Sequence, residues 1–270
     1  TIIGSVYEDD LDTKEIPELL SFESIKINTK DESKIDLLKN KIIVKESYFK
    51  SSKSIKDEDI LNQLRLISEV DKILTSYSSI GYTRLYSVIG KKIENFKVQL
   101  RRLSIDLSYR QKKKDINETD IFLINKGNDI LKKGWKVLEL LKEVDYISII
   151  NRSMNKNEIC LGKTDESNLR KNGFIEIGKL KNVCYNVIEE DVYVYLKKLK
   201  LKNKSLNVDY YIDEFIKINN LKVNSKDYIK VLLLFPSAAV KQWSKYKDNK
   251  KNLSSEEYLF NIKKAFEYEI

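Results

Sequence analysis

The strongest constraint on the fold is a series of long stretches in which apolar side chains recur at the helical period. Spacings of three and four residues predict an amphipathic helix with one buried face. The pattern begins at Asp57, in an acidic start that suits a helix N-terminus. Three stripes follow along the chain: Ile60, Leu64, Ile67, Val70 and Leu74; Ile89, Ile93, Phe96, Leu100, Leu103 and Leu107; Ile121, Ile124, Leu131, Trp135, Leu138 and Leu141. We interpret all three as faces of the core rather than as grooves for partners.

The C-terminal part of the chain repeats the helical period in three further segments: residues 208–219, 225–246 and 255–268. Pro236 lies inside the second segment and should kink or break the helix there, because proline has no backbone N–H. Side-chain caps are expected where two helices begin. Asn117, with Asp120 three residues later, precedes the third stripe. Ser254 and Glu257 have the same spacing before the last helix.

Short apolar runs predict strands in two parts of the chain. Phe22–Asn28 and Lys41–Phe49 lie within the first fifty residues and are rich in β-branched side chains. Glu158–Gly162 and Gly173–Leu180 follow the third helical stripe. The polar connector between this second pair ends in Asn-Gly, which is a strong turn signal. We therefore expect these two strands to form an antiparallel hairpin at about residues 157–180.

The order of these elements predicts an α+β fold that is mostly helical. Residues 1–50 are expected to form a small mixed α/β segment, with a short helix at Glu32–Lys41 between its two strands. Residues 51–270 are expected to form the larger helical part, which contains the hairpin. The polar stretch Ser51–Lys56 marks a weak boundary between the two.

The residue types present restrict the chemistry that this chain can carry out. The chain contains no histidine, so it lacks the commonest general base and any histidine metal ligand. Cys160 and Cys184 are too few for a disulfide framework or a zinc site, and we interpret them as small buried apolar residues. No glycine-rich phosphate-binding motif is present. From the residues alone, we find no catalytic constellation.

The charge balance favours an anionic partner without identifying one. The formal net charge of +9 raises the expectation of nucleic acid, an acidic surface or another protein. The lysines are scattered, however, so a solvated surface is the preferred interpretation and nucleic acid is not the expected partner. No apolar run approaches the roughly 20 residues needed to cross a bilayer, and we expect synthesis in the cytoplasm.

The stretch "VLLLFPSAAVKQWSKYKDNKKNLSSEEYLFNIKKAFE" (Val231–Glu267) resembles the CotS-like spore coat proteins of endospore-forming bacteria. In that family a Leu-Phe-Pro helix leads to an aromatic stretch ending in Tyr, a Lys-rich turn and a final helix. Asn125–Ile150 is similar to the family's long helix before the catalytic loop. These proteins share the fold of aminoglycoside and choline phosphotransferases, a relative of the protein kinase fold. The resemblance, from about Lys41 onward, implies a kinase-like fold with a reduced N-terminal lobe.

The resemblance also implies a position for the family's catalytic loop, at the string "NRSMNKNE". The family loop reads His-Gly-Asp, with an Asn five residues after the Asp. In this register Asn151 replaces the His, Ser153 replaces the catalytic Asp, and Glu158 replaces the metal-binding Asn. A shift of a residue or two would put Asn155 or Asn157 in the place of Glu158. Ser153 cannot serve as the carboxylate that orients an attacking hydroxyl.

The following strand carries the second part of the implied site. The family's Ile-Asp-Phe-type motif falls on Ile175–Ile177, so Glu176 replaces the metal-binding Asp. Glu176 could bind Mg²⁺, and Glu158 could share the ion. Asp191 matches a later Arg-Asp motif whose role in the family is mainly structural.

Together the resemblance and the missing side chains imply a non-catalytic pseudokinase scaffold of the spore coat. Its expected partners are other spore coat proteins, and its expected location is the mother-cell cytoplasm and then the coat. No cofactor is expected. One alternative is an active small-molecule or sugar phosphotransferase that uses ATP, Mg²⁺ and Glu176. The other alternative, suggested by the net charge of +9, is a basic nucleic-acid-binding helical protein.

Overall fold

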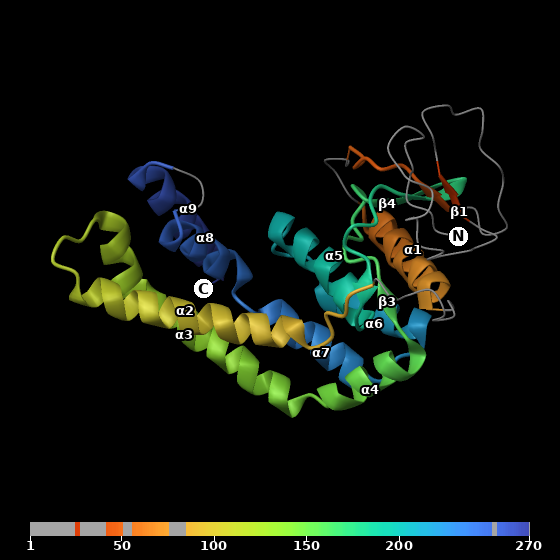
Figure 1. The fold of residues 1–270 in the computed structure, drawn as a ribbon, viewed down its shortest axis with the longest axis horizontal. Coiled ribbons are helices and arrows are strands. Elements are labelled where there is room, and N and C mark those ends of the chain that lie inside the picture. The colour runs from red at the N-terminus through yellow and green to blue at the C-terminus, as the bar shows by residue number, and fades with distance from the viewer. Residues whose placement is uncertain (1–24, 28–41, 51–55, 76–84, 250–252, 270) are drawn as a thin grey trace. The chain divides into compact units, whose positions relative to one another are not determined.

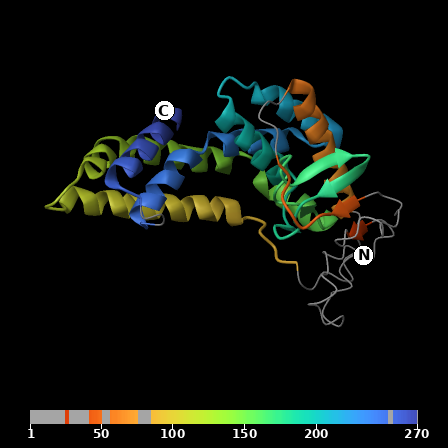
Figure 2. The ribbon, with the colours of Figure 1, turned by 90° about the horizontal axis from the view of Figure 1, so that it is seen from above.

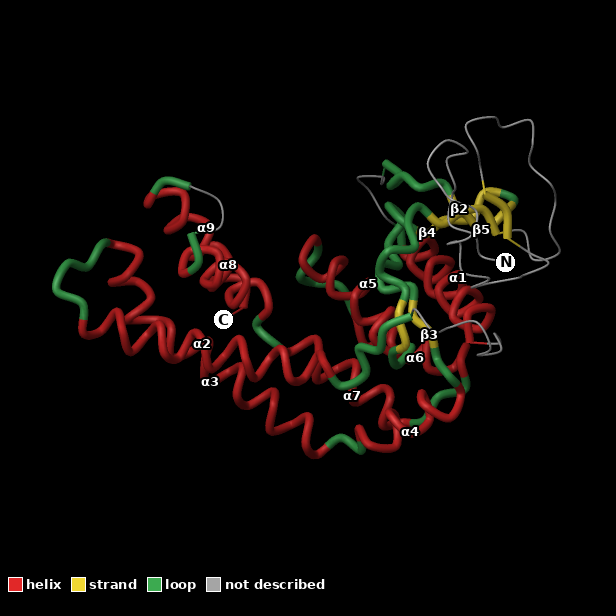
Figure 3. Tube along the Cα trace, viewed as in Figure 1, coloured by secondary structure: helices red, strands yellow, loops and turns green. Residues whose placement is uncertain are grey.

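The computed structural model describes residues 25–27, 42–50, 56–75, 85–249 and 253–269 of the chain. These residues are mostly helical and include short strands (Figure 3), so the predicted mostly helical α+β class is confirmed. The predicted helix at Glu32–Lys41 lies outside the described residues. Among the helices that the structure describes, none combines the length and the apolar character that a membrane crossing requires.

The elements of the described segments follow in the order of Figure 1. The helices are α1 Asp57–Thr75, α2 Lys91–Lys112, α3 Glu118–Glu143, α4 Tyr146–Lys156, α5 Glu189–Lys202, α6 Val208–Asn219, α7 Val223–Leu234, α8 Ser237–Lys247 and α9 Ser255–Glu269. The strands are β1 Ile25–Ile27, β2 Ile42–Val44, β3 Ile159–Cys160, β4 Leu169–Asn172, β5 Phe174–Ile177 and β6 Cys184–Tyr185.

The chain forms two compact units, and each unit combines segments that are distant in sequence. Unit 1 consists of Thr1–Ile89 and Ile147–Lys230. Unit 2 consists of Gly90–Tyr146 and Val231–Ile270. The predicted domain boundary after residue 50 stays a prediction, because residues 51–55 lie outside the described part of the chain.

Unit 1 contains a mixed sheet in the order β1-β2-β5-β4. β2 is parallel to both β1 and β5, while β4 and β5 form an antiparallel hairpin. Helix α1 packs beside this hairpin through β4, and it also contacts β3, α5 and α6 (Figure 1, Figure 2). The buried residues of unit 1 include those of β2 and β5 and the predicted stripe of α1.

The predicted hairpin has the wrong strand pairing. Gly173, at φ +69°, forms the turn between β4 and β5, so the Asn-Gly signal lies inside the hairpin rather than at the end of its connector. The predicted first strand, β3, pairs instead with β6, where Cys160 lies opposite Cys184. Both cysteines are buried free thiols, as predicted.

Unit 2 is a helical assembly in which α3 packs against α2 and α9, and α8 packs against the same two helices. Two glycines of α3 permit close approach. A Cβ at Gly134 would lie 2.5 Å from Leu100 of α2, and a Cβ at Gly127 would lie 2.8 Å from Trp243 of α8. The buried Trp243 indole N–H donates to the Asp106 carboxylate at 2.7 Å. Small residues thus set the spacing between these helices.

The predicted helix ends in unit 2 are confirmed. Asn117 accepts the backbone N–H of Asp120 at 2.9 Å and completes a capping box at the start of α3. Ser254 accepts the backbone N–H of Glu257 at 3.2 Å before α9, and the Glu257 carboxylate accepts the Ser254 N–H in return. Pro236 lies between α7 and α8, so the predicted break occurs there.

Candidate functional site

The string predicted to form a catalytic loop, Asn151–Glu158, is helical as far as Lys156. Asn151, Ser153 and Asn155 all lie in α4, so the expectation of a loop at these positions is wrong. The spacing of Ile149 and Ser153, four residues apart, is typical of one helix face, and both side chains are buried on one face of α4. Asn157 adopts a left-handed φ of +50° just past the helix, which is a common way for a helix to end.

Two of the predicted loop residues have structural contacts inside unit 1. The Ser153 hydroxyl is buried and donates to the backbone carbonyl of Asn186 at 3.1 Å. Both oxygens of Glu158 accept from the Arg152 guanidinium, at 2.8 and 3.0 Å. The same guanidinium donates to both oxygens of Glu189 at 2.7 Å, and these carboxylates raise the pKa of Arg152 despite its burial. A metal ion at Glu158 would have to displace this guanidinium.

The loop that leads into the hairpin is a different one, Leu161–Asn168. It connects β3 to β4, and its first turn is held by Asp191 of α5. The carboxylate of Asp191 accepts the backbone N–H groups of Leu161 and Gly162 at 2.7 and 2.8 Å. Burial raises the pKa of Asp191 to about 6, against the effect of these two donors. The contacts suit the structural role predicted for Asp191.

The other end of this loop is organised by the buried side chain of Asn168. Its amide donates to the carbonyls of Lys163 at 2.9 Å and Lys179 at 3.2 Å. Its side-chain oxygen accepts the Lys179 backbone N–H at 2.7 Å, and its carbonyl accepts the N–H of Gly178 at the same distance. Asn168 therefore ties the loop to the segment that follows β5.

Sequence reasoning missed Gly162, Lys163 and Asn168 as the organisers of this loop. The available signal was a glycine followed six residues later by an asparagine, directly before a strand. Gly162 has a φ of +74°, and a Cβ there would lie 2.5 Å from the carbonyl oxygen of Asn182. Only glycine fits that position without displacing the backbone.

Glu176 of β5 lies between two cations. Its carboxylate accepts from the Arg170 guanidinium, and the Lys45 ammonium lies 3.6 Å from its other oxygen. The Arg170 guanidinium also stacks over the Phe49 ring, 3.9 Å from its centroid. The two predicted metal ligands, Glu158 and Glu176, thus have different cationic partners. Within the described residues, no group of three or more Asp, Glu, Cys or His side chains is arranged to hold a metal ion.

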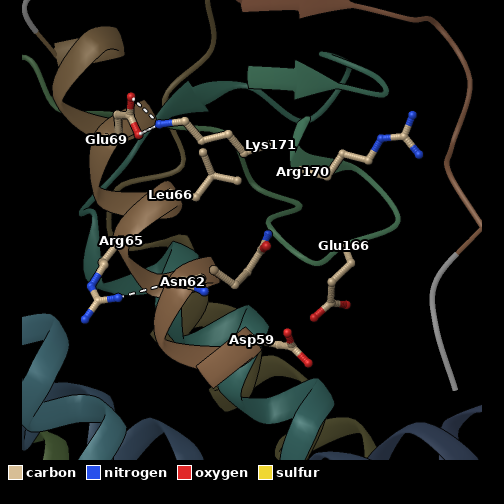
Figure 4. Close-up of a pocket in the computed structure, with 9 residues that line it drawn as sticks. Asp59, Asn62, Arg65, Leu66, Glu69, Glu166, Arg170 and Lys171 are labelled. Carbon is tan, nitrogen blue, oxygen red and sulfur yellow. Dashed lines mark hydrogen bonds and ion pairs between the residues drawn. The ribbon is translucent and has the colours of Figure 1, made fainter. Parts of the chain in front are cut away.

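A cavity of about 580 Å³ lies in unit 1 between α1, the Leu161–Asn168 loop and β4 (Figure 4). Most of its lining is charged or polar, and it comprises Asp59, Asn62, Gln63, Arg65, Leu66, Glu69, Glu166, Arg170 and Lys171. Lys171 is paired with Glu69 at 2.8 Å across it. The carboxylates of Asp59 and Glu166 point toward one another in Figure 4, and the Tyr195 hydroxyl donates to Glu166 at 3.1 Å.

Hydrogen bonds join α1, which forms one wall of this cavity, to the Leu161–Asn168 loop and the start of β4. The buried Gln63 amide donates to the carbonyl of Thr164 at 2.8 Å and to that of Leu169 at 2.9 Å. Any ligand in the cavity would therefore contact a wall that is fixed to the loop before β4.

Comparison with known proteins supports the fold and goes no further. No family model and no curated protein matches the sequence. Among solved structures, the chain is similar to an aminoglycoside phosphotransferase from Alicyclobacillus acidocaldarius, with a TM-score of 0.61 at 11% sequence identity. The alignment covers 78% of this chain and 63% of that one, so this chain spans less than two thirds of its neighbour's length.

At that identity the likeness shows the fold alone. The chain therefore has a kinase-like fold of the aminoglycoside phosphotransferase type, as the resemblance implied, while the reduced N-terminal lobe stays a prediction. The resemblance to CotS-like spore coat proteins is not confirmed by these comparisons and stays a prediction.

Proposed function

We propose that this chain is a non-catalytic, kinase-like scaffold protein of the spore coat. The observation that carries the non-catalytic part is the side chain at the catalytic-base position of the loop. In a kinase-like fold that position needs a carboxylate to orient the attacking hydroxyl. The loop Leu161–Asn168 puts a lysine there instead.

The register of the family motif is the first step of this argument. Gly162 and Asn168 match the Gly and the Asn of the family motif, and in this register Leu161 replaces the His and Lys163 replaces the Asp. The β4–β5 hairpin and Glu176 then follow directly, in the order that the family motif requires. This register replaces the one that put Asn151, Ser153 and Glu158 at these positions.

The chemistry of Lys163 is the second step. An ammonium group has no lone pair, so it cannot accept a proton or orient a hydroxyl as a base does. Glu176, the remaining candidate for metal binding, is already neutralised by Arg170 and Lys45. A divalent ion would have to compete with two cations for one carboxylate. Both observations support a loss of phosphoryl transfer.

The spore coat assignment rests on the C-terminal resemblance. The elements of that stretch are present in unit 2: α7 ends before Phe235 and Pro236, and α8 and α9 follow. We propose other coat proteins as partners, synthesis in the mother cell, and final location in the coat.

The test is a measurement of ATP turnover and ATP affinity with and without Mg²⁺. We expect no release or transfer of phosphate, and no gain in ATP affinity when Mg²⁺ is added. Turnover that requires Mg²⁺ and disappears in Glu176→Ala would contradict the proposal. It would support the alternative, an active small-molecule phosphotransferase.

One observation favours that alternative. Asn168 lies near the end of the strand that carries Glu176, since the carbonyl of Asn168 accepts the N–H of Gly178, two residues after Glu176. Asparagine and carboxylate oxygens are suitable Mg²⁺ ligands. The Asn168 side chain is engaged by the backbone at both ends, however, which makes the scaffold the better supported function.

A further inference from the structure

Three lysine ammonium groups converge on a single aromatic ring in unit 1. The nitrogens of Lys163, Lys179 and Lys181 lie 3.3, 5.4 and 5.9 Å from the centroid of the Tyr48 ring. Tyr48 itself is 40% exposed, so the ring and the ammonium groups meet at the surface. We call these four residues the lysine cluster.

The backbone beneath the lysine cluster is tightly held. The segment after β2 is attached on both sides of Tyr48, by Lys45 N–H to the carbonyl of Ile177 at 2.8 Å and by Phe49 N–H to that of Ser167 at 2.7 Å. Asn168 binds the backbone of Lys163 and Lys179. Tyr48, Lys163 and Lys179 therefore stand on backbone that is ordered by hydrogen bonds rather than on a free loop.

The positive charge of the lysine cluster is poorly compensated. None of its three lysines forms an ion pair with a carboxylate of the described residues, although Glu46 attracts Lys179 electrostatically. Each nitrogen lies within 5.9 Å of the ring centroid, so any two of them are at most about 11 Å apart, which is comparable to the Debye length of about 8 Å at physiological salt. They repel one another, and cation–π attraction to the ring offsets this in part.

We propose that the lysine cluster is a binding site for a compact, phosphate-bearing polyanion, and that it binds this ligand without a divalent metal. Lysine is a common phosphate ligand that acts as a point charge. Adjacent phosphate groups supply several negative oxygens on one compact ligand, so such a ligand can meet ammonium groups that are gathered around a single ring. Carboxylates on separate, flexible side chains supply fewer.

This inference deepens the proposed function and rests on it. In a catalytic site, Mg²⁺ offsets the charge of transferred phosphates. Here the ammonium of Lys163, at the catalytic-base position, would supply positive charge directly. The ligand would then be held but not processed.

The experiment is a calorimetric titration of the full-length protein with inorganic pyrophosphate, in EDTA and at low ionic strength. We expect saturable binding to one site. The triple variant Lys163→Gln, Lys179→Gln and Lys181→Gln should bind at least about tenfold more weakly, because it loses three charge-assisted contacts. Tyr48→Leu keeps the charges and removes the ring, so it should weaken binding by a smaller factor.

The matched control removes three exposed lysines from unit 2, through Lys112→Gln, Lys114→Gln and Lys126→Gln. It makes the same change in net charge, and its affinity should stay within about twofold of the parent protein, as for surface changes away from a site. Circular dichroism melts of both variants verify folding. If the cluster variant fails to fold, the single Lys181→Gln variant, which changes an exposed side chain, takes its place.

Several results would overturn the proposal. The proposal is wrong if pyrophosphate does not bind the parent protein. It is also wrong if the cluster and control variants lose the same amount of pyrophosphate affinity, because equal losses indicate diffuse electrostatic attraction. A requirement for Mg²⁺ contradicts metal-free binding. If polyglutamate binds through the cluster and pyrophosphate does not, the partner is an acidic protein segment. None of these results depends on ATP turnover, which tests the proposed function separately.

Discussion

Asp71 lies inside unit 1 with 2% of its surface exposed, on the buried face of α1. Burial raises its pKa well above the usual range for aspartate, and the carboxylates of Asp191, Glu158 and Glu189 act in the same direction. Folding at neutral pH therefore either keeps a proton on Asp71 or buries an unfavourable charge. The residue makes the stability of unit 1 sensitive to pH.

The sign of this pH dependence follows from the raised pKa. Folded Asp71 keeps its proton to a higher pH than the unfolded chain does, so unfolding releases a proton and stability falls as pH rises. The fall begins near the unfolded value of about 4 and continues up to the folded pKa. Asp71→Asn should remove the part of this slope that Asp71 contributes, and its advantage over the parent should grow by up to about 1.4 kcal/mol per pH unit in that window.

Urea unfolding at a series of pH values measures this difference. Glu58→Gln, an exposed change in the first turn of α1, serves as the control and should leave the slope unchanged. Parallel stability curves for the parent and Asp71→Asn would show that Asp71 is ionised in both the folded and unfolded states.

A second residue-scale prediction concerns the Arg152 guanidinium, which joins Glu158 to Glu189. Arg152→Met should destabilise the protein by about 3–5 kcal/mol, because it leaves two buried carboxylates without a cation. Arg152→Lys should recover only part of the loss, since an ammonium cannot bind two carboxylates in bidentate fashion. Denaturant unfolding tests this. The exposed change Arg102→Met is the control. If Arg152→Met and Arg102→Met are equally stable, the Arg152 guanidinium does not stabilise the fold through Glu158 and Glu189.

At the scale of elements, the helices were the predictable part of the fold. The stripes that start at Asp57, the caps at Asn117 and Ser254, and the break at Pro236 are all local signals, and all are present in the structure. Local signals were sufficient there because a helix is defined by contacts between residues three or four positions apart.

The candidate site was predicted less well because its contacts are long-range. Lys45, just after β2, reaches Glu176 from far away in sequence, and the pairing of β3 with β6 bypasses the hairpin between them. Neither can be inferred from neighbouring residues. The loop predicted around Ser153 is a helix, and the signal for it was local. Ile149 and Ser153 are four residues apart and are both buried on one face of α4. The Gly162–Asn168 spacing was visible in the sequence but was not used.

An element-scale prediction follows from the packing of α3 on α2. Alanine favours helices over glycine by about 1 kcal/mol. Even so, Gly134→Ala should destabilise the protein by about 1–3 kcal/mol, because its Cβ would collide with the side chain of Leu100. Leu100 is fully buried, so a shift of its side chain must displace the neighbours that pack around it. Thermal or urea unfolding measures the effect.

The control for this packing prediction is Asn125→Ala, an exposed change on the same helix, which should shift stability by less than about 0.5 kcal/mol. A Gly134→Ala variant that is more stable than the parent would mean that helix propensity outweighs packing at this site.

At the scale of the whole molecule, the proposed function predicts when and where the protein accumulates. In sporulating cells of the source organism we expect it late, and in purified spores we expect it in the coat fraction. Immunoblots of a sporulation time course and of extracted coats measure both. Accumulation during vegetative growth, or absence from the coat, would contradict the assignment.

The division of the chain between its units has a consequence for biosynthesis. Helices α2 and α3 leave the ribosome well before α8 and α9, yet Trp243 of α8 fills the space beside Gly127 of α3. The segment that completes unit 1 is translated in between. The nascent chain must therefore carry the unfinished apolar faces of α2 and α3 through the synthesis of about ninety further residues, a period in which they are open to chaperones or to aggregation.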